Sequence, residues 1–140
     1  PGSAGGMRPG PAAKFLGYSL RKQGWRTTYL ADVIPVADGD VLDLPGSPRI
    51  IGLPGHSPGS VAVHVPEAKA LFVGDALTTR NVLSGRTGLQ PSPFTDDPAQ
   101  ALETLDKLTS LPDVEWVLPG HGTPWNGPVS EVAASVRAGA

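Results

Sequence analysis

Three apolar runs along the chain are each followed by a glycine and then by a histidine or an aspartate. The runs are residues 49–53, 70–73 and 114–118, and the polar side chains that follow them are His56, Asp75 and His121. Short apolar runs bounded by glycine and proline predict buried strands. Loops at strand ends are held by a rigid sheet, and polar residues gather there at ligand sites. The pattern therefore predicts an α/β fold in which three strand ends supply one site.

The remaining periodicity predicts two hairpins and three helices. Residues 41–44 and 49–53 form one expected hairpin, and residues 61–65 and 70–73 form the other, whose last strand reads as buried on both faces. Helices are expected at residues 11–23, at 97–111, where Asp97 and Pro98 form a start signal, and at 129–138. Residues 78–95 are expected to form a long loop with a binding or lid role.

Composition narrows the classes of function. The 140 residues suit one domain. The net charge of −2, from 11 basic and 13 acidic residues without blocks, favours neither nucleic acid nor a membrane surface as a partner. The partner that we expect is a small-molecule substrate. The absence of cysteine excludes disulfides, a thiolate zinc site and a cysteine nucleophile. The start of the chain lacks the layout of a signal peptide, so a cytoplasmic location is the simplest expectation.

Two imidazoles and one carboxylate suit a divalent cation. Without thiolates, His56, Asp75 and His121 favour Zn²⁺, with Mn²⁺ or Fe²⁺ as substitutes. The glycine before each of them allows a sharp turn and a close approach of the backbone. Ser57 is expected either to fix the loop of His56 by hydrogen bonding or to be a simple turn residue.

Three strings in order, "PGHSPGS", "LFVGDAL" and "VLPGHG", resemble the C-terminal half of the metallo-β-lactamase superfamily over residues 33–138. The resemblance implies an αββα sandwich, here with a mixed sheet and flanking helices. It also implies that His56 ligates a first metal, that Asp75 bridges two metals as the catalytic carboxylate, and that His121 completes the second site. The implied activity is a metal-dependent hydrolase, in which a metal-bound hydroxide attacks an ester, thioester, lactone or related bond.

The chain departs from this family at its start. The family's first motif, His-x-His-x-Asp-His, is absent, and the one remaining histidine, His64, is interpreted as a structural residue of a strand. Residues 1–6 are interpreted as a tag remnant and the native start, and residues 7–140 as a single, partial domain of a truncated, weakly active form. Half a sandwich exposes an apolar sheet face. We therefore expect a homo-oligomer, a domain-exchanged dimer or a partner chain that carries the N-terminal half.

Other residues have weaker assignments. Thr78 and Arg80 follow Asp75 and are candidates for substrate binding, with a solvated loop as the alternative. Trp125 follows His121 and is either a pocket wall or part of the core. A different class of function also stays open: a non-catalytic binding or assembly module that keeps the fold without the chemistry.

Overall fold

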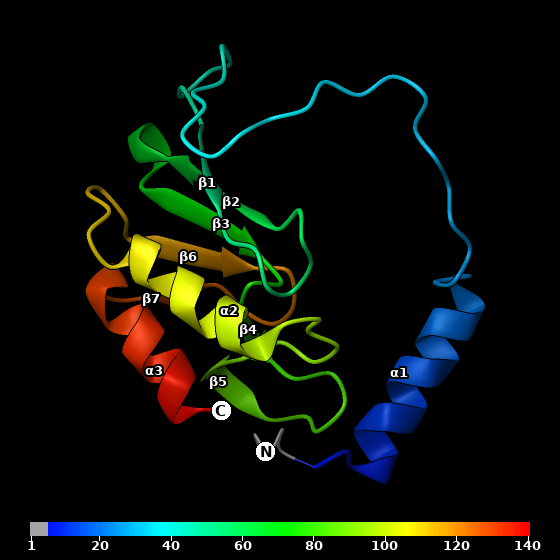
Figure 1. Cartoon of the computed structure of the whole chain (residues 1–140). Coiled ribbons are helices and arrows are strands. Elements are labelled where there is room, and N and C mark those ends of the chain that lie inside the picture. Colours follow the sequence, from blue (N-terminus) through cyan, green and yellow to red (C-terminus); the bar gives the residue numbers. More distant parts are fainter. Residues whose placement is uncertain (1–5) are drawn as a thin grey trace.

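A computed structural model describes residues 6–140, in which the strands form a five-stranded and a two-stranded sheet (Figure 1). The five-stranded sheet has the order β1-β2-β3-β6-β7, and the smaller sheet pairs β4 with β5. The strands of the two sheets are β1 (Arg49–Gly52), β2 (Val61–Val65), β3 (Ala70–Gly74), β4 (Thr78–Arg80), β5 (Thr87–Gln90), β6 (Trp116–Pro119) and β7 (Trp125–Asn126). The helices are α1 (Pro9–Arg21), η1 (Pro66–Ala68), α2 (Pro98–Thr104), η2 (Leu105–Leu108), η3 (Val129–Glu131) and α3 (Val132–Ala138). Of the tag remnant and native start expected at residues 1–6, residues 1–5 lie outside the described residues.

The direction of the strands places three strand ends at one edge of the sheet. Strand β2 runs antiparallel to both β1 and β3, so β1 and β3 run the same way. Strand β6 lies beside β3 and is parallel to it. The carboxyl ends of β1, β3 and β6 therefore point to the same edge, and the loops that follow them carry the three predicted site residues.

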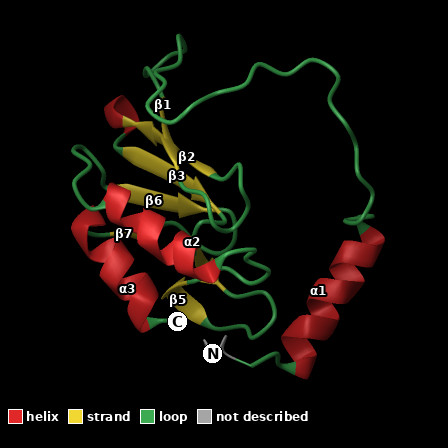
Figure 2. Cartoon of the chain, viewed as in Figure 1, coloured by secondary structure: helices red, strands yellow, loops and turns green. Residues whose placement is uncertain are grey.

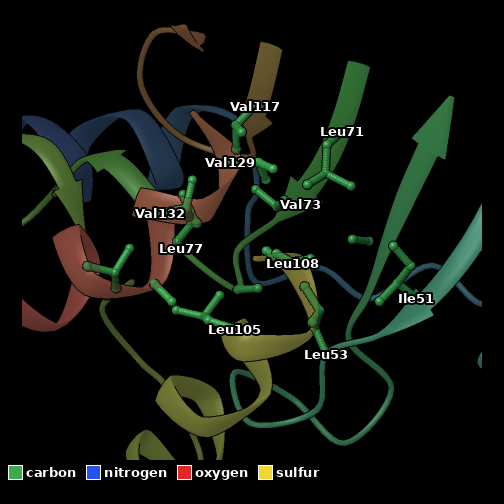
Figure 3. Close-up of a cluster of buried hydrophobic side chains, with 14 residues drawn as sticks. Ile51, Leu53, Leu71, Val73, Leu77, Leu105, Leu108, Val117, Val129 and Val132 are labelled. Carbon is green, nitrogen blue, oxygen red and sulfur yellow. The ribbon is translucent and has the colours of Figure 1, made fainter. Parts of the chain in front are cut away.

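The helices α2, η2 and α3 cover one face of the large sheet (Figure 2). The core between the two layers is made of aliphatic side chains from both (Figure 3). Leu71, Val73 and Val117 come from the sheet, and Leu105 and Val132 come from the helical layer. Asp97 caps α2 by accepting a hydrogen bond from the backbone N–H of Gln100 at 3.0 Å, as its position before Pro98 predicts. The mixed sheet with flanking helices is the fold class that the sequence predicts.

The opposite face of the sheet carries exposed apolar side chains. Phe72 alternates with the core residues of β3 and is 47% exposed, and Trp116 of β6 is 44% exposed. Val63 and Leu118 lie directly beside Phe72 on the neighbouring strands, so the four residues share this face. The prediction that β3 is buried on both faces is therefore wrong, because an apolar run looks the same in sequence whether or not a second layer covers it.

The expected loop at residues 78–95 contains regular structure. Strands β4 and β5 form an antiparallel hairpin there, which their polar and glycine-rich sequence did not indicate. Conversely, residues 41–44 of the first expected hairpin make only one bridge, between Val41 and Arg49. Backbone pairing in both places is decided by neighbouring segments and not by local periodicity.

Helix α1 forms close to its expected position and lies apart from the main sheet (Figure 1). None of its own side chains is buried, and the extended segment that leads from it to β1 exposes Trp25, Tyr29 and Ile34. Among residues 6–140, the structure contains no helix with the length and apolar character needed to cross a bilayer.

Candidate metal centre

The three predicted metal ligands meet at the carboxylate of Asp75. Nδ1 of His121 lies 2.8 Å from Oδ1 of Asp75, and Nε2 of His56 lies 3.8 Å from Oδ2 of the same carboxylate. Each carboxylate oxygen thus faces one imidazole. His56 and Asp75 are half-buried, whereas the His121 side chain is 48% exposed. The residues come from three different strand ends, and the fold brings them to one point of the sheet edge.

The loop of His56 rests on the start of α2. The backbone N–H groups of Asp96 and Asp97 donate to the carbonyls of His56 and Gly55, at 3.2 and 2.9 Å. Gly55 is buried with φ +136°, and a Cβ on it would overlap the backbone of Ala101. Glycine is therefore required here for both its backbone conformation and its lack of a side chain.

The loop of His121 packs against the residues that surround Asp75. Gly120 donates its N–H to the carbonyl of Gly74 at 2.8 Å, and a Cβ on Gly120 would strike Oδ1 of Asp75. The backbone N–H of Thr79 donates to the carbonyl of His121 at 3.1 Å, and the hydroxyl of Thr78 lies 2.8 Å from that oxygen and 2.9 Å from the carbonyl of Arg80, either of which can accept its one proton. These contacts hold the imidazole of His121 against the carboxylate.

An ion pair anchors the end of β1, just before the His56 loop. Asp38 accepts hydrogen bonds from Nζ of Lys107 at 2.7 Å and from the N–H of Gly52 at 2.8 Å. Both bonds favour the charged carboxylate, so the pKa of Asp38 lies below its ordinary value, with Lys107 the larger cause. Lys107 also donates to the carbonyl of Gly52, which ties η2 to the same strand end.

Thr95 contacts Nδ1 of His56, the ring nitrogen that does not face Asp75. The sequence patterns did not predict this contact. Nδ1 of His56 lies 3.2 Å from Oγ1 of Thr95, 39 positions later in the chain. Of the two roles expected for Ser57, fixing the His56 loop or forming the turn, the structure agrees with the second, because its hydroxyl pairs with that of Ser60 at 2.9 Å. Ser57 therefore stabilises the turn itself. No sequence signal links Thr95 to His56, because the contact depends on where α2 begins in space.

The predicted substrate-binding residues occupy different environments. Thr78 is fully buried, which assigns its hydroxyl to the support of the His121 loop. Arg80 is exposed and, together with His121, lines a cavity of about 700 Å³ whose other wall is α1. Trp125 is half-buried and packs against the hydrophobic core, and it is not among the residues that line this cavity. Substrate contact remains a prediction for all three.

The donor set fits a divalent cation in kind but not in number. Imidazole and carboxylate are ligands for zinc and iron, and both histidines lie beside Asp75. Three donors fall short of the four that a closed zinc site uses. Among residues 6–140, no group of three or more His, Asp or Glu side chains is arranged to hold a metal ion. The cluster therefore supplies part of a ligand set.

His64 has the position that was expected of a structural histidine. It is 2% exposed and shares the helix-covered face of β2 with Ala62. Its Nε2 atom is buried and has no hydrogen-bond partner within residues 6–140. His64 is not one of the residues that meet at Asp75.

Comparisons with known proteins agree with this architecture. The hydroxyacylglutathione hydrolase of Ruegeria pomeroyi is 36% identical over 89 residues, which are 63% of this chain and 32% of that protein. An acyl-coenzyme A thioesterase of Bos taurus is 28% identical over 102 residues, or 72% of this chain and 35% of that protein. The chain thus spans about a third of the length of the curated relatives it matches.

Solved structures share the fold. The metallo-beta-lactamase family protein TTHA1429 of Thermus thermophilus superposes with a TM-score of 0.62 at 25% identity, over 86% of this chain and 39% of that one. TTHA1623, solved in a di-iron-bound form, gives a TM-score of 0.54 at 30% identity, over 93% of this chain and 62% of that one. The family model of the metallo-beta-lactamase superfamily matches residues 7–121. With that match over most of its length, the chain belongs to the metallo-beta-lactamase superfamily.

Proposed function

We propose that this chain is the C-terminal part of a metal-dependent hydrolase, and that His56, Asp75 and His121 are its share of the metal ligands. The observation that carries the proposal is the single carboxylate in contact with two imidazoles at one sheet edge. Three separate strand ends converge there, and glycine is required at Gly55 and Gly120 for the approach.

Thioesters are the substrate class that we would test first, ahead of esters and lactones. Support comes from two relatives, one named for hydroxyacylglutathione and one for acyl-coenzyme A thioesters. Arg80 lines the same cavity as His121, which supports a role for it in contacting the substrate. An exposed guanidinium at that position favours substrates that carry a negative charge.

The residues of the cluster have separable tasks in this proposal. His56 and His121 present ring nitrogens, and Asp75 presents its charge between them. A bound divalent cation supplies Lewis acidity, which makes water a stronger nucleophile and polarises the scissile bond. Zn²⁺ is our first choice, with Mn²⁺ and Fe²⁺ as alternatives. Thr78 and Gly120 hold the His121 loop in place.

Metal analysis tests the ligand assignment directly. We expect the chain to bind zinc weakly, because three ligands without further donors rarely fix two cations. His56→Ala and His121→Ala are each expected to abolish this binding, as measured by mass spectrometry of the metal after equilibrium dialysis. His64→Leu is the matched control, since it removes a histidine that lies away from the cluster. Stoichiometric zinc that survives both site substitutions would refute the site.

Hydrolysis assays test the activity and separate it from the rival function. With zinc present, we expect slow thioester cleavage that Asp75→Asn abolishes, because the amide cannot supply the negative charge. We also expect Arg80→Ala to raise KM more for anionic than for neutral thioesters. If no thioester, ester or lactone is cleaved above the buffer rate with any of the three metals, the non-catalytic binding or assembly module becomes the better proposal.

Association is part of the same proposal. The exposed face that contains Phe72 and Trp116 is apolar, and such patches mark sites of contact with other proteins. We propose that this face is covered by a second copy, through simple association or domain exchange, or by a partner chain that carries the N-terminal half.

We also propose a cytoplasmic location. Fractionation of cells that express the natural protein tests this proposal.

A further inference from the structure

The hydroxyl of Thr95 has two hydrogen-bond partners within reach, and one arrangement of protons satisfies both. Oγ1 of Thr95 lies 2.9 Å from the carbonyl of Ser92 and 3.2 Å from Nδ1 of His56. A hydroxyl carries one proton, and a carbonyl oxygen only accepts. Both contacts are hydrogen bonds only if the Thr95 proton goes to Ser92 and the bond with His56 uses a proton on Nδ1.

The other nitrogen of His56 has no acceptor within hydrogen-bond distance among residues 6–140. Nε2 lies 3.8 Å from Oδ2 of Asp75, which is longer than a hydrogen bond. A neutral imidazole holds its single proton on the nitrogen that has an acceptor within reach. The Thr95 oxygen is that acceptor, so the proton resides on Nδ1 and the lone pair on Nε2 faces Asp75.

We propose that Thr95 is a positioning residue that holds His56 as its Nδ1–H tautomer, with the Nε2 lone pair directed toward the Asp75 carboxylate. Two electron-rich atoms that face each other across 3.8 Å are complementary to a cation between them. This last consequence rests on the proposed function, whereas the tautomer itself does not.

The surroundings of Thr95 fix its hydroxyl relative to the imidazole. The residues on its C-terminal side, Asp96 and Asp97, donate backbone hydrogen bonds to the His56 loop. On its N-terminal side, Phe94 has φ +61°, a conformation that a residue with a bulky side chain adopts only when its surroundings impose it. The ring of Phe94 is in turn 6.1 Å from that of Phe15 in α1. The backbone hydrogen bonds of Asp96 and Asp97 therefore hold Thr95 next to the His56 loop.

Nitrogen-15 NMR of the metal-free chain measures the tautomer directly, through the distinct shifts of protonated and bare ring nitrogens. In the neutral imidazole, we expect His56 to show a protonated Nδ1 and a bare Nε2. Thr95→Val keeps the shape of the side chain and removes the acceptor, and one hydrogen bond corresponds to a roughly 2- to 12-fold change in tautomer ratio toward Nε2–H. Thr95→Ser should restore the wild-type ratio.

Two results would overturn the proposal. One is a wild-type His56 that carries its proton on Nε2, which needs no variant and so holds even if Thr95→Val fails to fold. The other is a Thr95→Val protein with unchanged His56 shifts and with His64 and His121 resonances that show an intact fold.

Zinc titration of the same proteins separates this inference from the proposed function. Loss of a partner that orients a ligand lowers metal affinity by about 10- to 100-fold, and we expect that loss in Thr95→Val and not in Thr95→Ser. Equal zinc affinity of Thr95→Val and the wild type would contradict the positioning role. A wild-type chain that binds no zinc would overturn the proposed function, while the NMR result would still decide the tautomer.

Discussion

The substitution Gly55→Ala tests whether the His56 loop depends on a close backbone contact. The new methyl group would lie 2.7 Å from Cβ of Ala101 and closer still to the backbone of that residue, at the start of α2. The loop cannot easily retreat, because the N–H of Asp97 is bonded to the carbonyl of Gly55 and that of Asp96 to the carbonyl of His56. The substitution therefore forces either the loop or α2 to move.

The expected loss has two parts. Overpacking a tight contact costs about 1–3 kcal/mol, and a non-glycine residue at φ +136° adds about 1–3 kcal/mol. We expect the free energy of unfolding to fall by about 3 kcal/mol, a large share of the roughly 5–15 kcal/mol that stabilises a typical domain. At a typical dependence on urea of about 1–3 kcal/mol per M, the midpoint of unfolding moves down by about 1–3 M.

Urea unfolding followed by circular dichroism measures this loss. Gly59→Ala is the matched control, because the two glycines lie in the same turn and nothing is within 4 Å of a Cβ on Gly59. We expect the control to stay within about 0.5 kcal/mol of the wild type. If Gly55→Ala is as stable as Gly59→Ala, the contact with Ala101 does not fix this loop and the reasoning fails.

Three further predictions concern other parts of the chain. His64→Leu should raise the free energy of unfolding by about 1 kcal/mol, because it removes a buried nitrogen without a partner, and a clear loss in urea unfolding would contradict this. Asp38→Asn should cost no more than about 1 kcal/mol, since the Lys107 pair is exposed. The pKa of Asp38 is lowered in the folded state. The difference in free energy of unfolding between the wild type and Asp38→Asn should therefore be largest above the unfolded pKa near 3.9, and it should disappear as pH falls through the folded pKa. A difference that does not change with pH would show that the charge of Asp38 is not its cause. In size-exclusion chromatography with light scattering, we expect a mass above that of one chain, reduced by Phe72→Lys, whereas a clean monomer would remove the case for association.

The strands of the sheet were predictable where their sequence has its own period. Residues 61–65 alternate strictly, and they form β2 with the expected face buried. Strands β4 and β5 lack such alternation and nevertheless pair as an antiparallel hairpin. Local periodicity therefore could not predict them.

Burial was predictable for only one of the two sheet faces. The core residues Leu71 and Val73 are buried by helices that the sequence predicts. Phe72 belongs to the same apolar run and is exposed, since its burial depends on a layer that the described residues do not supply. An apolar side chain favours burial, but its sequence position does not show whether another layer of the protein covers it.

The candidate site was predictable at the level of strand ends. The glycines before His56 and His121 mark close approaches in the sequence, and the structure places a neighbour against each of them. Thr95 was not predictable, because its contact with His56 requires the position of α2 relative to β1. The residues that orient a site thus come from packing, whereas the residues that form it come from motifs.

The parallel pairing of β3 with β6 also sets the order in which the site assembles during folding. Asp75 and His121 are 46 positions apart, and the segment between them contains α2 and the small hairpin. The β2–β3 hairpin closes over a few residues, but β6 reaches β3 only after this long crossover has been traversed. Distant contacts form slowly because the entropy of closing the loop is lost before the contact is gained. We therefore expect the contact between Asp75 and His121 to be among the last to form as the chain folds.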